Sequence, residues 1–290
     1  MTSICLLTTM CSSCGIALTE RYGSELLMLR SYTKHGWRDH IASLKRQASA
    51  GNVSAMRDLG LNLFEGIQDR RGRSLIRRNP RIAVTWFRRA ARHGDLTAAG
   101  SLGYAYDVGL GARRNVDQAI HWYRLAAKLG NATAASNLAT VYRDTGNPRL
   151  AFQWWKRSAG MGNGDAAVDV GYCQQYAIGT RKDVAGAQRM FRRAIASRDI
   201  SQYGREEAMY HLAVHFIDEG QLRLALPLLK RACADDDFPE AKSLLKQIKT
   251  QSTCVPCRCK RHIKKALRGH ATCRLHPRYM IWLPKVARCL

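Results

Sequence analysis

The chain has 290 residues, of which 46% are hydrophobic, and it carries a formal net charge of +25. This is enough apolar material for the core of one elongated unit or of two domains. The mean hydropathy is −0.32, and no apolar run approaches the length of about 18 residues that a membrane-spanning helix needs, so the composition argues against such a helix.

The N-terminal stretch MTSICLLTTMCSSCG has no basic residue ahead of its short apolar patch at residues 4–7. A secretory signal peptide needs a basic start and a longer apolar segment, so we expect a cytoplasmic protein. We expect residues 1–23 to be a disordered leader. Residues 24–50 are expected to form a helix that caps the segment that follows.

The ten cysteines of the chain do not indicate a disulfide framework, because cytosolic thiols are kept reduced. Cys173 and Cys233 lie within apolar helical patterns. We therefore expect both to be buried, unreactive thiols.

Residues 51–249 contain an internal repeat. The segments AVTWFRRAARHG (83–94), AIHWYRLAAKLG (119–130) and AFQWWKRSAGMG (151–162) share one spacing of Ala, Trp, Ala or Ser, and Gly. The first Ala returns every 32 to 38 residues, at positions 83, 119, 151, 187 and 225. The positions expected to be structural are Ala83, Trp86, Gly94, Ala119, Trp122, Gly130, Ala151, Trp154 and Gly162.

A second pattern interleaves with the first, as in GDLTAAGSLGYAYD (94–107) and GNATAASNLATVYR (130–143), with Ala at the fifth place and mostly Leu at the ninth. Spacings of three and four put shared residues on one side of a helix. Ala lets two helices approach while Trp or Leu fills the space beside it, so we expect the Trp and Tyr residues of the patterns in the core. The recurrent Gly marks a helix end, so each unit is two antiparallel helices, and pairs must stack to bury their apolar faces.

These residues resemble the Sel-one-like repeat family, a relative of the tetratricopeptide repeats. The copy at 94–130 matches the family pattern at Gly94, Ala98, Leu102, Gly103, Tyr106, Gly109, Gly111, Ala119, Trp122, Tyr123, Ala126, Ala127 and Gly130. The resemblance implies an all-α fold, a right-handed α/α superhelical solenoid of five to six helix-turn-helix repeats. It also implies a non-catalytic scaffold that binds a partner protein or peptide in a groove lined by the first helix of each pair.

The first copy departs from the pattern by an insertion, IQDRRGRSLIRRNP (67–80), and the third by the short loop DTGNPRL. The block 70–81 has six Arg and no acidic residue. Such a block is either a solvated basic loop or a contact for phosphate or for an acidic partner. The candidate contact residues are Arg70, Arg71, Arg73, Arg77 and Arg78.

We find no catalytic residues in the sequence. The segment HLAVH (211–215) has the histidine spacing of a zinc protease but Leu212 replaces the required glutamate, so we expect His211 and His215 to be groove or surface residues. The adjacent carboxylates Glu206 and Glu207 have no evident partner. No phosphate-binding or nucleophile motif is present.

The C-terminal segment 254–290 is basic and contains CVPCRCKRHIKKALRGHATCRLH, with paired cysteine spacing at one end and a Cys–His pair at the other. Zn²⁺ takes four thiolate or imidazole ligands, so the segment is expected to hold one Zn²⁺ per chain. Its ligands would be four of Cys254, Cys257, Cys259, Cys273 and His276. A metal-free helical cap on the last repeat and an unstructured tail remain the alternatives.

Two functions are compatible with these features. The first is a protein-protein interaction scaffold for an unidentified protein or peptide. The second is a nucleic-acid-associated scaffold for RNA or DNA, in which the basic insertion and the basic C-terminal segment contact phosphates; specific RNA recognition would also call for exposed aromatic side chains.

Overall fold

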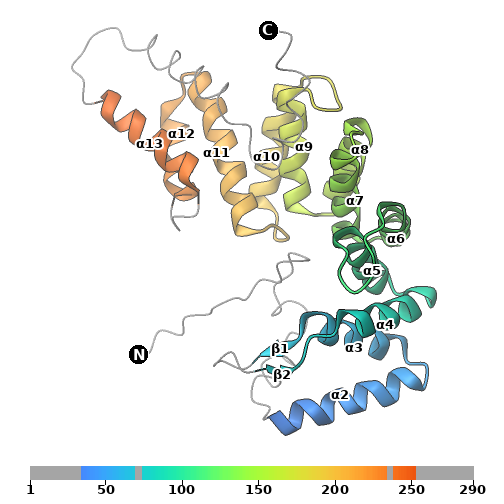
Figure 1. Cartoon of the computed structure of the whole chain (residues 1–290). Coiled ribbons are helices and arrows are strands. Elements are labelled where there is room, and N and C mark those ends of the chain that lie inside the picture. Colours follow the sequence, from blue (N-terminus) through green and yellow to red (C-terminus); the bar gives the residue numbers. More distant parts are fainter. Residues whose placement is uncertain (1–33, 69–73, 234–237, 253–290) are drawn as a thin grey trace, which may run out of the picture. The chain divides into compact units, whose positions relative to one another are not determined.

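The structure is a computed structural model that describes residues 34–68, 74–233 and 238–252. Within these ranges it contains twelve helices and one two-stranded hairpin (Figure 1). The chain divides into two compact units, residues 1–141 and 142–290. None of the described helices is long and apolar enough to span a membrane.

The first unit is a run of helices in which each packs on the next. Helices α2 to α6 pack in chain order, α2 on α3 through to α5 on α6. Trp37 and Leu44 of α2 are buried, so α2 covers the N-terminal end of this run; residues 24–33 of the expected capping helix lie outside the described residues. The bounds are α2 Lys34–Ser49, α3 Val53–Glu65, α4 Pro80–Arg92, α5 Leu96–Val108, α6 Val116–Lys128 and α7 Ala132–Asp144, whose last three residues belong to the second unit.

The second unit continues the same arrangement. Helix α9 packs against α8 and α10, α11 packs against α10 and α12, and α13 packs on α12; α9 and α11 are also in direct contact. The array extends to the end of α13, three residues past the expected boundary at 249. The bounds are α8 Pro148–Gly160, α9 Gly164–Tyr176, α10 Val184–Ala196, α11 Gln202–Asp218, α12 Leu222–Ala232 and α13 Pro239–Ser252.

The insertion of the first repeat forms a small hairpin instead of a plain loop. Strands β1 (Ile67–Gln68) and β2 (Ser74–Ile76) pair antiparallel, with Ile67 opposite Ile76. Ile76 is buried and β2 lies against α2. The hairpin is therefore anchored to the helical core at its base.

The first helix of each pair begins at a side chain that caps it. Asn52, Asp95, Asn131, Asn163 and Ser201 each accept a hydrogen bond from the backbone N–H three residues ahead, at 2.7–3.0 Å. An N-cap of this kind satisfies a donor that the helix leaves unpaired. This explains the polar residue that precedes most of these helices in the sequence.

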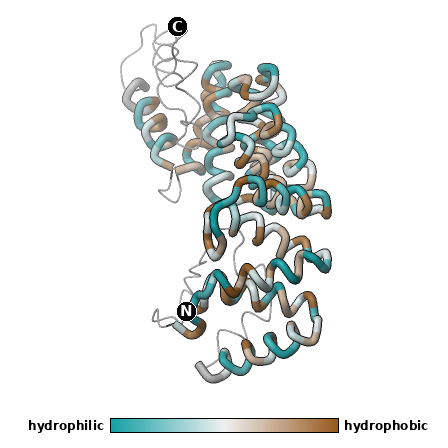
Figure 2. The backbone as a smooth tube through the Cα atoms, turned by 45° about the vertical axis from the view of Figure 1, so that its right-hand side comes forward, coloured by the Kyte–Doolittle hydropathy of each residue, from teal (hydrophilic) through white to brown (hydrophobic). Residues whose placement is uncertain are grey.

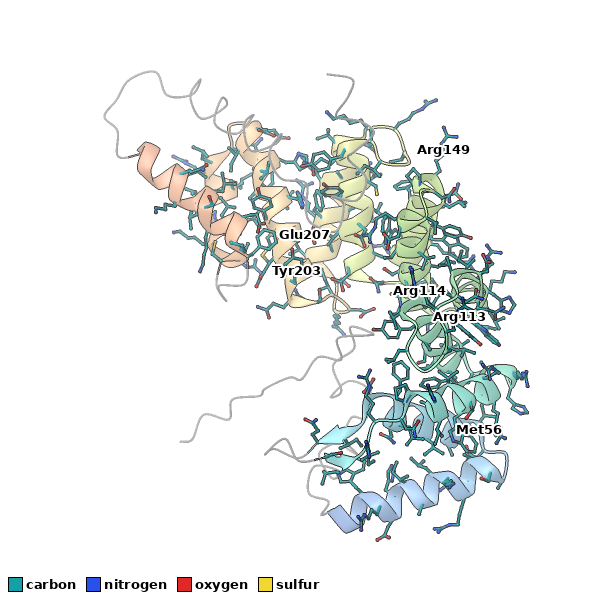
Figure 3. All side chains as sticks on the ribbon, in the orientation of Figure 1. Met56, Arg113, Arg114, Arg149, Tyr203 and Glu207 are labelled. Carbon is teal, nitrogen blue, oxygen red and sulfur yellow. The ribbon has the colours of Figure 1, made fainter. Side chains whose placement is uncertain are left out.

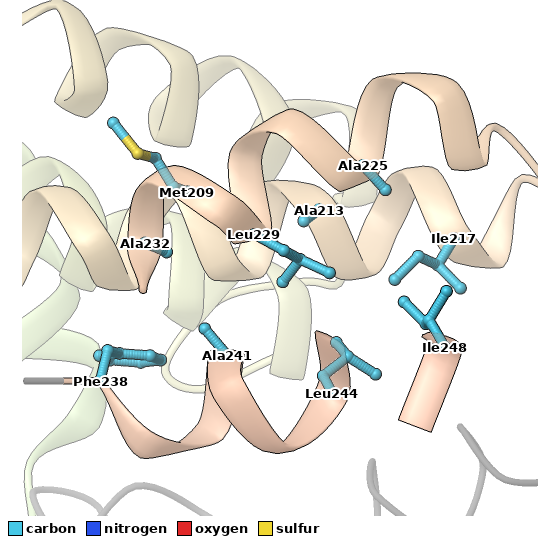
Figure 4. Packing of buried hydrophobic residues seen from close by; sticks show 10 residues of the cluster. All are labelled: Met209, Ala213, Ile217, Ala225, Leu229, Ala232, Phe238, Ala241, Leu244 and Ile248. Carbon is cyan, nitrogen blue, oxygen red and sulfur yellow. The ribbon is translucent and has the colours of Figure 1, made fainter. Parts of the chain in front are cut away.

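The core pairs a ring of the second helix with a glycine of the first. Phe87, Tyr123 and Phe191 are fully buried. A Cβ added to the facing Gly60, Gly103 or Gly171 would lie 2.6 Å from a ring carbon. In the last pair, Ala213 faces Leu229 within one apolar cluster (Figure 4). Close packing therefore requires facing residues of complementary size: glycine on the first helix faces an aromatic ring on the second, and alanine faces leucine.

The buried ring follows the tryptophan of the pattern by one residue. Trp86 is buried, but Trp122 and Trp154 are only partly buried, whereas Tyr123 and Trp155 are almost fully enclosed. The expectation that every patterned Trp lies in the core is thus wrong for Trp122 and Trp154. Apolar and polar residues alternate along each helix, as the tube of Figure 2 shows. In α6 and α8 the residue that follows the patterned Trp is the one buried against the partner helix.

Gly94, Gly130 and Gly162 follow the ends of α4, α6 and α8 with φ of +85°, +99° and +104°. A Cβ on any of them would meet no atom within 4 Å. The requirement for glycine at these positions is therefore conformational, because side chains disfavour the left-handed region.

Candidate functional site

Charge is divided between the two kinds of helix. The first helices of the pairs, α3, α5, α7, α9 and α11, carry nine acidic and three basic residues. The second helices, α4, α6, α8, α10 and α12, carry fifteen basic residues and one acidic residue, Asp117. A chain of net charge +25 therefore concentrates negative charge on its first helices.

The acidic character is greatest in the second unit, on α9 and α11. These two helices hold five acidic residues and one basic residue, Arg205. Arg205 Nη2 donates a hydrogen bond to the carbonyl oxygen of Ser197 at 3.1 Å. At about 100° per residue, Arg205 lies on the opposite side of α11 from Tyr203 and Tyr210.

The same helical spacing places Tyr203, Tyr210 and Val214 of α11 on one stripe, flanked by Glu206 and Glu207. All three stripe residues are partly buried. Tyr203 and Glu207, one turn apart, are labelled on α11 in Figure 3. We call the residues Tyr172, Tyr176, Tyr203, Glu206, Glu207, Tyr210 and Asp218 the acidic tyrosine face.

Glu207 and His211 connect α11 to its neighbours. The side chain of Glu207 is 5% exposed, and its Oε1 lies 4.0 Å from Nε2 of His211. The His211 ring stacks on Phe191 of α10 at 5.2 Å and meets Tyr172 of α9 edge-on at 5.6 Å. Both the histidine and the carboxylate are thus buried between helices, and the expectation that Glu207 has no partner is wrong.

Glu206 is the second buried carboxylate of this face. Its Oε1 accepts a hydrogen bond from Gln202 at 3.1 Å. Its Oε2 is buried and has no hydrogen-bond partner within the described part of the chain. Because a buried acceptor without a donor costs free energy, Glu206 is a position at which a donor from outside the described residues would be stabilising.

Tyrosines surround these carboxylates. Burial, followed by the nearby charges of Tyr176 and Glu240, raises the pKa of Tyr210 to about 12. Burial and the charge of Asp218 also raise the pKa of Tyr176, and burial together with Tyr176 and Glu207 raises that of Tyr172. All three phenols therefore stay protonated near neutral pH and offer O–H donors and π faces beside negative charge.

His215 does not form a metal site with His211. It is buried, burial lowers its pKa, and its Nε2 is buried without a partner among the described residues. The described residues contain no group of three or more side chains suited to holding a metal ion. The expectation that His211 and His215 are groove or surface residues is wrong, since both are buried inside the helical array.

The other predicted site residues have the following positions. Arg77 and Arg78 are exposed, and Arg78 Nε donates a hydrogen bond to the carbonyl oxygen of Phe64 at 2.8 Å, which ties it to the fold. Cys173 is fully buried and burial raises its pKa, whereas Cys233 is only partly buried. Outside the described residues lie Arg70, Arg71 and Arg73, and the predicted zinc ligands Cys254, Cys257, Cys259, Cys273 and His276.

Tandem α/α pairs with a shared packing pattern define a helical-repeat protein. Within this class, the Sel1 repeat model matches residues 53–95, 97–131, 132–163 and 164–199. The chain belongs to the Sel1 repeat family, which confirms both the predicted family and the all-α solenoid fold. Proteins of this family are generally non-catalytic protein-interaction scaffolds.

Solved structures agree on the fold. A protective antigen of uropathogenic Escherichia coli strains, described as an SLR fold, superposes with a TM-score of 0.61 at 22% identity; the match covers 80% of this chain and 48% of the antigen. A Sel1 repeat protein from Oxalobacter formigenes gives 0.59 at 22% identity, covering 72% of this chain and 58% of that protein. The chain thus spans about half the length of these two structures. None of the curated proteins matches its sequence.

Sequence reasoning missed the acidic tyrosine face, although a signal for it was present. Residues 199–240 carry nine acidic and four basic side chains in a strongly basic protein. Alignment of this segment with the other repeats places Glu206, Glu207 and His211 where the first helix of one pair meets the first helix of the next.

Proposed function

We propose that this protein is a non-catalytic scaffold that binds a partner protein through the first helices of its repeats, at the acidic tyrosine face of α9 and α11. The observation that carries the proposal is the pair of buried carboxylates, Glu206 and Glu207, on either side of a tyrosine stripe. A partner segment containing Lys or Arg supplies donors to the carboxylates and cations to the tyrosine rings.

The test uses a fluorescein-labelled peptide of 16 residues that alternates Lys or Arg with Ala. We expect binding by fluorescence anisotropy at low salt, weakened at least tenfold in the double variant Glu207→Gln, Asp218→Asn. The single variant Asp117→Asn, which removes an acidic residue from a second helix, is the control. Equal affinity of the double variant and the control would exclude this face as the binding surface.

The nucleic-acid alternative remains a prediction. It is favoured by the predominance of basic residues on the second helices, since phosphate contacts need only Lys and Arg. Arg77 and Arg78 are exposed and could join such a contact. A cytoplasmic location likewise stays a prediction.

We also propose that residues 254–276 hold one Zn²⁺ through four of the five predicted ligands, because paired Cys and His at this spacing suit tetrahedral coordination. Elemental analysis of protein made without a His tag should give about one zinc per chain. Replacing Cys257 or Cys273 with Ser should remove the metal, and metal-free protein with free thiols would end the proposal.

A further inference from the structure

The second helices of the second unit carry positive charge in a regular pattern. Helices α8, α10 and α12 contain three basic residues each and no acidic residue. In each helix a basic pair comes directly after a fully enclosed residue, which is Trp155, Phe191 or Leu229. All six residues of these pairs are exposed. We call them the basic ladder: Lys156 and Arg157, Arg192 and Arg193, and Lys230 and Arg231.

The ladder lies on the outer side of these helices. At about 100° per residue, Lys156 and Arg157 lie roughly 120–140° around α8 from the buried Ala151, one to each side. The other two pairs have the same place in their repeats. Arg193 Nη2 of α10 donates a hydrogen bond to the carbonyl oxygen of Ala159 in α8 at 2.7 Å, so the first two pairs lie on adjacent helices. Helix α11 packs against both α10 and α12, and the row continues to the third pair (Figure 1).

No acidic side chain among the described residues neutralises the ladder. The side chains of Lys156, Lys230 and Arg231 make no hydrogen bond, ion pair or ring contact within the described part of the chain. Arg157 lies over the ring of Trp154 at 5.2 Å and Arg192 over that of Phe216 at 5.8 Å, contacts that leave their charge uncompensated.

The acidic side chains beside α10 are directed to other residues. Asp183 lies 3.7 Å from Arg189, and Oε1 of Glu219 accepts a hydrogen bond from Gln188 at 2.8 Å. The ladder therefore presents its positive charges to solvent.

Helix electrostatics explain only part of this pattern. Cations in the last turn of a helix stabilise it, and Arg157, Arg193, Lys230 and Arg231 lie in last turns. Arg149 and Arg223, however, lie at the second position of α8 and α12, where the helix dipole disfavours a cation. Each lies seven residues before a ladder lysine and so within about 20° of it around the helix; Arg149 is labelled in Figure 3. Positive charge thus extends along the whole outer side of both helices, which helix stability alone does not favour.

This chemistry fits a nucleic acid better than a protein partner. The centre of a protein interface is depleted of charged residues, whereas interfaces with DNA are polar and strongly positive. Six of the eight residues, the ladder with Arg149 and Arg223, are arginines, whose planar guanidinium binds phosphate in a bidentate manner. None of the eight is aromatic, so the surface offers no stacking platform for the bases of a single strand.

We propose that the basic ladder binds the phosphate backbone of a double-stranded nucleic acid without reading its bases. The nucleic-acid contact predicted from the sequence lies elsewhere, in residues 70–81 and 254–290. The ladder also lies on the second helices, whereas the acidic tyrosine face lies on the first helices. The inference is therefore independent of the proposed function, and either can fail without the other.

The experiment measures binding of the full-length protein to a fluorescein-labelled DNA duplex of about 20 base pairs by fluorescence anisotropy, over a salt series of roughly 50 to 200 mM. The ladder variant carries Lys156→Gln, Lys230→Gln and Arg231→Gln. Because each phosphate contact adds about 0.9 to the slope of log affinity against log salt, we expect the variant to lose about 2 to 3 from the slope and to bind about tenfold more weakly. The control variant Arg38→Gln, Lys45→Gln, Arg46→Gln removes three exposed charges from α2 and should keep the wild-type slope.

Absence of binding by the wild type at low salt, or equal slopes for the ladder variant and the control, would overturn the inference. Two competitors test the class of ligand. Unlabelled duplex should displace the labelled duplex better than a polyglutamate peptide or the single strand at equal concentration of negative charge. Equal displacement by polyglutamate would assign the surface to acidic proteins, and better displacement by the single strand would exclude a double-stranded ligand; either result overturns the proposal.

Discussion

Ala177 has a backbone conformation that residues with a side chain disfavour. It ends α9 with φ +58° and ψ +35°, in the left-handed region, and its N–H bonds the Cys173 carbonyl. Gly109 has the same place at the end of α5, with φ +75°. An L-residue in this region costs roughly 1–2 kcal/mol, so alanine is locally unfavourable at this position.

Replacing Ala177 with Gly should therefore stabilise the protein by about 1 kcal/mol. The free energy of unfolding in urea measures the effect. The reverse exchange at the equivalent position, Gly109→Ala, should destabilise the protein by a similar amount or more, because the added Cβ would also lie 3.2 Å from Cβ of Arg114. A loss of stability in Ala177→Gly would contradict the argument.

His215 makes stability depend on pH. Burial lowers its folded-state pKa from 6.5, although Asp218 and Glu219 act in the opposite direction; the aromatic neighbour on α10 is Phe191, at 6.1 Å. The unfolded chain then binds a proton before the folded chain does. The stabilising contribution is present above pH of about 6.5 and is lost as the pH falls through the lowered folded pKa.

The variant His215→Leu should show a weaker loss of stability between about pH 6.5 and 5 than the wild type, because it has no imidazole to protonate. Near pH 7.5 its stability should be similar or higher, since the unpartnered buried Nε2 is removed. Urea unfolding at a series of pH values is the measurement. Parallel pH profiles for the two proteins would show that His215 is not the titrating group.

At the scale of the element, three of the helix pairs, α3–α4, α5–α6 and α9–α10, are held by a glycine that admits a ring. The variant Gly103→Ala forces a Cβ to within 2.6 Å of Tyr123, which is fully buried and cannot move aside. We expect a loss of about 1–3 kcal/mol in the free energy of unfolding, as for other overpacked cores.

Gly160, in the last turn of α8, is the matched control. It is exposed and a Cβ there would meet no atom within 4 Å. Gly160→Ala should therefore be neutral or stabilise by up to about 1 kcal/mol through helix propensity. If both variants lose the same stability, the close approach of the helices is not the cause.

At the scale of the whole molecule, the uneven distribution of charge should govern binding to polyanions. The double variant Lys156→Gln, Lys230→Gln removes two exposed charges from second helices, whereas Lys242→Gln, Lys246→Gln removes two exposed charges from α13. We expect only the first to elute from heparin at clearly lower salt. Equal shifts would mean that net charge alone sets retention.

The fold was predictable because its cause is local and repeated. Ala, Leu, Gly and aromatic residues recur at helical spacing, and one pair of helices cannot bury its own apolar side. The hairpin at Ile67–Ile76 was not predictable in this way, since it occurs once, within an insertion. The tryptophan pattern also misled at Trp122 and Trp154, because a spacing of three to four residues does not say which of two adjacent aromatics turns inward.

The sequence by itself determined the family, the helical pairs and the residues that shape their contacts, because these depend on spacings within about 40 residues. Only the tertiary structure decided what surrounds Glu206, Glu207 and His211. Their environment comes from the neighbouring helices α9, α10 and α13, whose contacts with these particular residues the repeat spacing does not specify, and burial beside those helices turns ordinary surface residue types into a candidate binding face.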